Sequence, residues 1–179
     1  MSNVVIFNGS ARKNGNTSKL VDAFVRGASP KHSITIFNLA EMDIHPCRAC
    51  NACFDNEDLL CIHKDDMQKI YPALAKADIV VVATPVYLFG ISAQMKLMLD
   101  RLHVRGRKNF RVKEIALFVV AGSSKKEMFD PVLLQYKMLV EFFGLESLGT
   151  VLVGNTLQEE IGEDHPALAQ AQALGETIE

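Results

Sequence analysis

Five short apolar runs constrain the fold of this chain more than any other feature of its sequence. Each run is unbroken and rich in β-branched residues, which is typical of strands buried on both faces of a parallel sheet. Between them, helical spacing recurs, and the 34–37 run has the most polar flanks. The alternation predicts a doubly wound α/β sandwich with right-handed crossovers and the 34–37 run at its edge. The runs are residues 4–7, 34–37, 79–83, 115–121 and 148–153.

Length and composition fit one domain and disfavour several classes of protein. The chain has 179 residues, of which 49% are hydrophobic, so residues 1–179 are expected to share one substantial core. A net charge of −2 gives no basis for nucleic-acid or membrane binding. No apolar run can span a bilayer, and the start of the chain lacks the basic residues of a signal peptide. We therefore expect a cytoplasmic protein, in which cysteines stay reduced.

A polar loop follows the first apolar run and leads directly into a predicted helix. It reads GSARKNGNTS from Gly9 to Ser18. Free backbone N–H groups and the helix dipole make such a junction an anion site. The loop lacks the lysine spacing of nucleotide-triphosphate loops and the glycine pattern of dinucleotide folds. Two interpretations stay open, namely a compact phosphate site and a polar turn with an N-cap at Asn16.

Two further loops follow the third and fourth runs, at residues 84–90 and 121–124. Ligands of open α/β sheets bind beyond the carboxyl ends of the strands. Tyr87 and Phe89 suit a flat apolar ligand there, although they can also pack against their own domain. Gly122 permits close backbone approach to a ligand, or simply a turn. Together, the three loops describe a ligand with a phosphate and a flat ring, which is the shape of FMN.

These loops, with Gln94-Met95-Lys96 and Asp100-Arg101, resemble the NADPH-dependent FMN reductase family from about residue 3 to residue 155. The resemblance implies a flavodoxin-like three-layer sandwich whose five-stranded parallel sheet has the order 2-1-3-4-5. It implies phosphate binding by Ser10, Arg12, Asn16 and Thr17. It implies that the flavin ring contacts Pro85, Val86, Tyr87, Leu88 and Phe89, with Gly122 and Ser123 at its polar edge.

The same resemblance implies a function and an assembly. Electrons from NAD(P)H would pass through FMN to a flavin, a quinone or a similar acceptor. Members of the family commonly form dimers or tetramers, so a homodimer or homotetramer is expected. We name no catalytic residue, because no general acid or base stands out in these loops.

All four cysteines of the chain lie in residues 46–66, spaced Cys47-x2-Cys50-x2-Cys53-x7-Cys61. Three cysteines at this spacing can surround one compact metal core, and the fourth can close it, as in iron–sulfur clusters. Zinc is disfavoured because its structural sites usually pair two separated knuckles. Two other interpretations stay open, namely a redox dithiol site and a loop that binds nothing. The acidic residues between Cys53 and Cys61 add negative charge near the cysteines, which makes it harder to bring four thiolate ligands together.

The cysteine segment also resembles the iron–sulfur flavoprotein branch of the same superfamily. The alternative function is therefore an electron-transfer module with a [4Fe–4S] cluster that a ferredoxin-like partner reduces. A basic run follows the third predicted helix, from Arg101 to Lys113. It is either a solvated connection or a docking patch for the 2′-phosphate of NADPH or an acidic electron donor.

Overall fold

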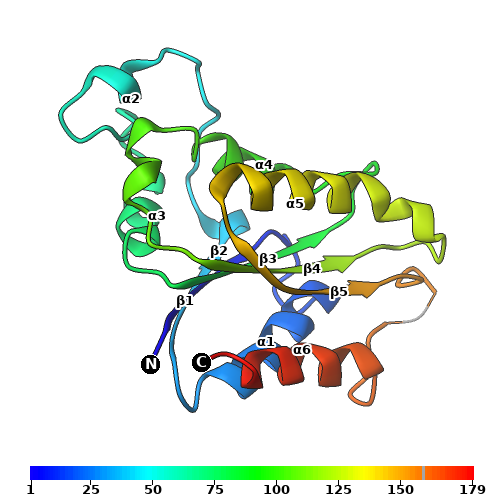
Figure 1. The fold of residues 1–179 in the computed structure, drawn as a ribbon. Coiled ribbons are helices and arrows are strands. Elements are labelled where there is room, and N and C mark those ends of the chain that lie inside the picture. The colour runs from blue at the N-terminus through cyan, green and yellow to red at the C-terminus, as the bar shows by residue number, and fades with distance from the viewer. Residues whose placement is uncertain (159) are drawn as a thin grey trace.

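A computed structural model of the protein describes residues 1–158 and 160–179. Its strands form one parallel sheet with the order β2-β1-β3-β4-β5 (Figure 1). Both the predicted strand order and the predicted edge position of residues 34–37 are confirmed. The strands are β1 (Asn3–Asn8), β2 (Ser33–Asn38), β3 (Ile79–Pro85), β4 (Glu114–Val120) and β5 (Glu146–Val153).

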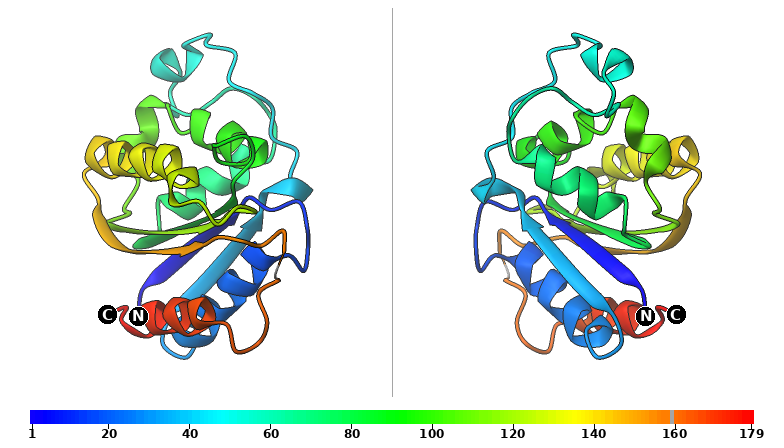
Figure 2. Two further views of the ribbon diagram at one scale, coloured as in Figure 1. Left: turned by 90° about the vertical axis from the view of Figure 1, so that its right-hand side faces the viewer. Right: turned by 90° about the vertical axis from the view of Figure 1, so that its left-hand side faces the viewer.

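Helices cover both faces of the sheet and complete the predicted three-layer sandwich (Figures 1 and 2). One face carries two helices that pack against each other, and the other face carries the remaining long helices. The first pair is α1 (Asn16–Ala28) and α6 (Pro166–Glu176). The second group is α3 (Met67–Leu74), α4 (Ala93–Asp100) and α5 (Asp130–Phe143).

The central strands read as unbroken apolar runs because both of their faces are buried. In β1, Val4 and Ile6 join the core beneath α1 and α6. Val5 and Phe7 point the other way and join the core beneath the second group of helices. This alternation places successive side chains in two different cores, as the geometry of a strand requires.

Helix α5 is apolar on more than one side. Its inner face contributes Val132 and Tyr136 to the core, and Gly144 ends the helix in the left-handed conformation that glycine adopts readily. Its outer face leaves Leu134, Met138 and Phe142 exposed by 60%, 61% and 57%. The i, i+4, i+8 spacing aligns these three side chains in one stripe, which we call the α5 stripe.

Candidate functional site

Three loops meet at the carboxyl edge of the sheet. They follow β1, β3 and β4, which are neighbours in the sheet. The last pairs in register are Asn8 with Ala83 and Pro85 with Val120, so these strands end at similar heights. The loops predicted to hold FMN therefore emerge side by side. We call them the first, second and third loops.

The first loop ends at an uncapped helix. Helix α1 begins at Asn16, and no side chain among the described residues caps its amino end. Its first turn also contains no acidic residue that would neutralise the helix dipole. The backbone N–H groups at this end are therefore suited to an anion, as the sequence predicts.

The four predicted phosphate residues share this loop but differ in exposure. Ser10 is buried, and its hydroxyl accepts a hydrogen bond from the Arg12 N–H at 3.1 Å, which shapes the turn. The Arg12 side chain is exposed, whereas Thr17 is buried. The Oδ1 atom of Asn16 accepts a hydrogen bond from the Ile161 N–H at 3.1 Å and ties the loop to the segment before α6.

Gly9 allows the first loop to lie against the start of α4. A Cβ atom at this position would lie 2.7 Å from the Ser92 Oγ atom. Ser92 caps α4 by accepting a hydrogen bond from the Met95 N–H at 3.3 Å. The Gly9 N–H donates to the Ala83 carbonyl at 2.8 Å. These contacts fix the first loop beside the end of β3, where the second loop begins.

The second loop is a tight turn that presents three bulky side chains to solvent. Tyr87 and Gly90 exchange two backbone hydrogen bonds of 3.0 and 3.1 Å. Leu88 and Phe89 between them have φ values of 45° and 67°, in a region that bulky residues rarely occupy. Tyr87, Leu88 and Phe89 are 51%, 95% and 59% exposed, so the interpretation that the aromatics pack against their own domain is wrong. Strained, exposed apolar side chains at a strand end are typical of a ligand site.

The third loop is held by residues 155–157, which follow β5 and were not among the predicted site residues. The Gly122 and Ser123 carbonyls accept hydrogen bonds from the Leu157 and Asn155 N–H groups at 3.3 and 2.9 Å. Leu157 is 86% exposed and lies over Gly122, where a Cβ atom would be 2.6 Å from its Cγ atom. The Gly154-Asn155 pair after β5 is a turn signal that points to this segment.

A buried ion pair closes the two ends of the cysteine-rich segment, residues 46–66. The Arg101 guanidinium donates to both carboxylate oxygens of Asp65 at 2.6 and 3.0 Å and to the His45 carbonyl at 2.7 Å. Both charged side chains are only 1% exposed. Burial alone would raise the pKa of Asp65, but the hydrogen bonds from Arg101 and from backbone N–H groups outweigh it and lower this pKa. The Tyr71 hydroxyl donates to the Arg101 carbonyl at 2.9 Å and completes the clamp.

The cysteine segment rests on the residues that follow α4. The Gly106 N–H donates to the Leu59 carbonyl at 2.7 Å, and the Phe54 and His103 rings lie 5.7 Å apart. Arg105 donates to the Phe54 carbonyl at 3.2 Å. Figure 1 shows the segment, with α2 (Ala52–Asp55), projecting beyond α3 and away from the carboxyl ends of the strands.

The four cysteines are free thiols that gather without forming a metal site. Cys47 and Cys50 are exposed, while Cys53 and Cys61 are half-buried. Burial, followed by the nearby Cys61 and Cys47, raises the pKa of Cys53. Across residues 1–158 and 160–179, however, no three His, Cys, Asp or Glu side chains lie close enough to hold a metal ion. The segment therefore contains the donors of a cluster, but in this arrangement they do not fit one.

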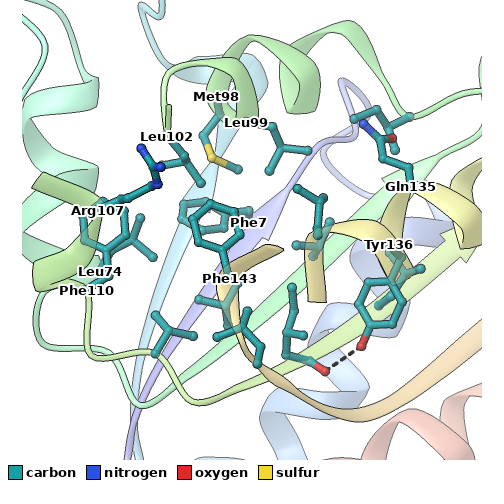
Figure 3. A pocket seen from close by; sticks show the side chains of 18 of the residues that line it. Phe7, Leu74, Met98, Leu99, Leu102, Arg107, Phe110, Gln135, Tyr136 and Phe143 are labelled. Atoms are coloured by element: carbon teal, nitrogen blue, oxygen red, sulfur yellow. Dashed lines mark hydrogen bonds between the residues drawn. The ribbon is translucent and has the colours of Figure 1, made fainter. Parts of the chain in front are cut away.

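An apolar cavity of about 100 Å³ lies between the sheet, α4 and α5 (Figure 3). Its lining is almost entirely aliphatic and aromatic, and its few polar side chains include Arg107 and Gln135. The Tyr136 hydroxyl donates to the Ile115 carbonyl at 2.8 Å. Among the described residues, the lining of this cavity includes no His, Cys, Asp or Glu and no residue of the three loops, so we assign it no chemistry. Within the described residues, no helix is long and apolar enough to cross a membrane.

Comparison with known proteins adds sequence relatives to this geometry. The family model for NADPH-dependent FMN reductase matches residues 2–157. An iron–sulfur flavoprotein of Methanosarcina thermophila is 37% identical over 120 residues, which cover 65% of this chain and 61% of that relative. The match thus spans about three fifths of the length of that relative. A Bacillus subtilis protein named for an NAD(P)H-dependent, FMN-containing oxidoreductase activity is 27% identical over 179 residues, covering 96% and 95% of the two chains.

Solved structures with the same fold are similar over nearly their whole length. An NAD(P)H:quinone oxidoreductase from Methanothermobacter marburgensis superposes with a TM-score of 0.79, at 14% identity and 99% coverage of both chains. An azoreductase from Bacillus anthracis superposes with a TM-score of 0.76, at 18% identity and coverage of 99% and 100%. At these identities the likeness establishes the flavodoxin-like architecture alone.

Proposed function

The chain belongs to the NADPH-dependent FMN reductase family, and from this premise we propose an FMN-dependent oxidoreductase that passes electrons from NAD(P)H to a flavin, a quinone or a similar acceptor. One observation carries the proposal. Three adjacent loops combine an uncapped helix end with an exposed, strained aromatic turn. The first feature suits a phosphate and the second suits a flat ring, and FMN has both.

The residues of this chain bind and orient the cofactor. The amino end of α1 and Arg12 would hold the phosphate, with Ser10 and Asn16 shaping the loop around it. Residues 85–89 would contact the ring and exclude water from one of its faces. The N–H groups of Gly122 and Ser123 would serve its polar edge. FMN bound there would supply the redox chemistry, namely hydride acceptance from NAD(P)H and electron transfer to the acceptor.

Binding of FMN compared with riboflavin tests this proposal. The two flavins share the ring, but only FMN has the phosphate that the first loop would hold. Titration into flavin-free protein, followed by flavin fluorescence, should show one FMN per chain and an affinity for riboflavin that is lower by at least about tenfold. Equal affinities would show that the first loop does not bind the phosphate.

A second candidate function is an iron–sulfur flavoprotein that takes electrons from a ferredoxin-like partner. Its supporting observations are the four thiols in one clamped segment and the matched relative that carries this name. The segment would have to rearrange to ligate a cluster, because its present arrangement brings no three donors together among the described residues. No redox step is therefore assigned to it.

Iron and sulfide analysis of anaerobically purified protein separates the two candidates. About four irons and four sulfides per chain would match a [4Fe–4S] cluster ligated by all four cysteines. A yellow protein without iron supports the flavin function alone. We also propose a cytoplasmic location, because four cysteines in one segment suit a compartment in which thiols stay reduced.

We also propose that the chain forms a homodimer or homotetramer through the α5 stripe. A helix that is apolar on both its inner and outer faces is usually buried on both. In one copy of the described chain, the outer face of α5 remains open to solvent. A second copy would cover this face without changing the carboxyl edge of the sheet.

A further inference from the structure

A polar pocket opens between the two arms of the cysteine segment. The first arm contributes His45, Pro46 and Arg48, and the second contributes His63, Lys64 and Asp65. The Arg101 clamp at the base of the arms keeps them together. The pocket has a volume of about 370 Å³, many times the volume of one water molecule. It is separate from the three loops at the carboxyl edge and from the cavity beneath α5.

The pocket has a net positive character. Among the described residues, Asp65 is the only acidic one in its lining, and Arg101 donates to both oxygens of this carboxylate. The His45 Nε2 atom lies 3.2 Å from the Asp43 Oδ1 atom. The imidazole therefore already contacts a carboxylate, and Asp43 is not part of the pocket lining. The positive charge of the pocket therefore comes from Arg48 on the first arm and Lys64 on the second. His63 adds a further hydrogen-bonding group.

We propose that this pocket binds a phosphate group of a small anionic ligand. Arginine offers a planar pair of N–H donors to such a group, and lysine adds a compact charge. Because the two cations come from opposite arms, one phosphate between them would be bridged by residues on both sides of the cysteines. Cys47 lies between Pro46 and Arg48, so occupancy of the pocket would restrict the part of the segment that holds this thiol.

Two sources of ligand share this chemistry, namely inorganic pyrophosphate and the phosphates of a nucleotide such as NADP+. The titration with nucleotides rests on the proposed function, since it concerns the co-substrate. The titration with pyrophosphate does not depend on that function. A preference for NADP+ over NAD+ that disappears when the pocket is neutralised identifies the 2′-phosphate as the ligand. Binding of pyrophosphate without such a preference identifies a free phosphate source.

The test is isothermal titration calorimetry of pyrophosphate, NADP+ and NAD+ into FMN-saturated protein. Saturation with FMN keeps the first loop occupied, so that a phosphate cannot bind there. The double variant Arg48→Ala/Lys64→Ala should weaken pyrophosphate binding about tenfold or more, because two charge-assisted contacts are lost. Lys31→Ala, an exposed charge in the α1–β2 turn, is the matched control and should leave binding unchanged.

Four results would overturn the proposal. Three are the absence of pyrophosphate binding, an unchanged affinity in the double variant, and an equal loss in Lys31→Ala. The fourth is a loss caused instead by Lys108→Ala, which would move the site to the basic run that follows α4. The thermal midpoint of each variant checks that it is folded. The flavin absorbance of the same samples reports FMN binding separately, so a failed pocket is distinguishable from a failed flavin site.

Discussion

At the scale of single residues, Arg12 is the one cationic side chain among the residues predicted to contact the FMN phosphate. It is exposed in the middle of the first loop, and its carbonyl accepts a hydrogen bond at 3.2 Å from the N–H of Gly15, which precedes the uncapped start of α1. Arg12→Ala should lower the affinity for FMN by about ten- to a hundredfold, since a hydrogen bond to a charged group contributes roughly 1.5–3 kcal/mol. Riboflavin binding should not change. Flavin fluorescence titration measures both.

The neighbouring lysine supplies the control for this substitution. Lys13 is paired with Glu41 at 2.9 Å and is highly exposed. Lys13→Ala removes the same charge one position along the chain and should leave FMN affinity within about twofold, because an exposed, paired charge contributes little. Equal effects of the two substitutions would mean that general charge, and not a contact from Arg12, governs binding.

The buried pair of Asp65 and Arg101 makes a prediction about stability. Arg101→Met leaves the Asp65 carboxylate buried without its partner, which should lower the free energy of unfolding by about 3–5 kcal/mol. Replacing both, as Asp65→Leu/Arg101→Met, should recover most of that loss because no unpaired charge remains. Urea denaturation of both variants measures the difference. A double variant no more stable than the single one would show that the pair acts through packing alone.

Acid should weaken the same clamp. The pKa of Asp65 is lowered by folding, so its contribution to stability is complete above the ordinary carboxyl pKa of about 4 and is lost as the pH falls through the lowered value. The difference in unfolding free energy between the native protein and Asp65→Asn should therefore be largest near neutral pH and shrink below about pH 4. A difference that stays constant with pH would contradict this assignment.

At the scale of elements, the second loop contains a turn whose bulky residues have backbone angles that such residues rarely adopt. Tight turns with two positive φ angles favour Asn and Gly at the central positions, where this chain has Leu88 and Phe89. Leu88→Asn/Phe89→Gly should raise the free energy of unfolding of flavin-free protein by about 1–3 kcal/mol. It should also weaken FMN binding, because the apolar contacts with the ring are lost. If the variant is more stable but binds FMN with unchanged affinity, the flavin ring does not contact Leu88 and Phe89.

Helix α5 makes a prediction about assembly. Met138 is at the centre of the α5 stripe and is 61% exposed. Met138→Glu should shift the protein towards monomer in analytical ultracentrifugation, since a charge would be buried in the interface between copies. Gln170→Glu adds the same charge on the exposed side of α6, beyond the opposite face of the sheet, and should leave the association state unchanged. A native protein that is already monomeric would refute this interface.

The sequence predicted the strands and their edge because burial on both faces of a sheet leaves a pattern in consecutive residues. It also predicted that the three loops meet at the carboxyl edge of the sheet, since their glycines and polar residues follow the strands directly. The strain at Leu88 and Phe89 could not be predicted, because bulky residues argue against a positive φ. The pairing of Asp65 with Arg101 joins residues 36 positions apart and depends on the tertiary fold.

At the scale of the whole molecule, the carboxyl edge of the sheet and the cysteine segment are two chemically different regions. Its carboxyl edge gathers the three loops, while the cysteine segment projects beyond α3 and rests on His103, Arg105 and Gly106. Sequence order alone did not reveal this docking, because Cys47 follows β2 closely and its contacts come from residues after α4. The three loops proposed to bind FMN contain no residue of the cysteine segment, so the proposed flavin site does not require a cluster.

The most direct test of the central claim is anaerobic addition of NADPH or NADH to the FMN-loaded protein. We expect the yellow absorbance of the flavin to bleach with at least one nicotinamide nucleotide and to return when a quinone or free flavin is added. Dithionite gives the full extent of reduction as a reference. A flavin that stays oxidised with both nucleotides but bleaches with a reduced ferredoxin would contradict the account and favour the iron–sulfur alternative.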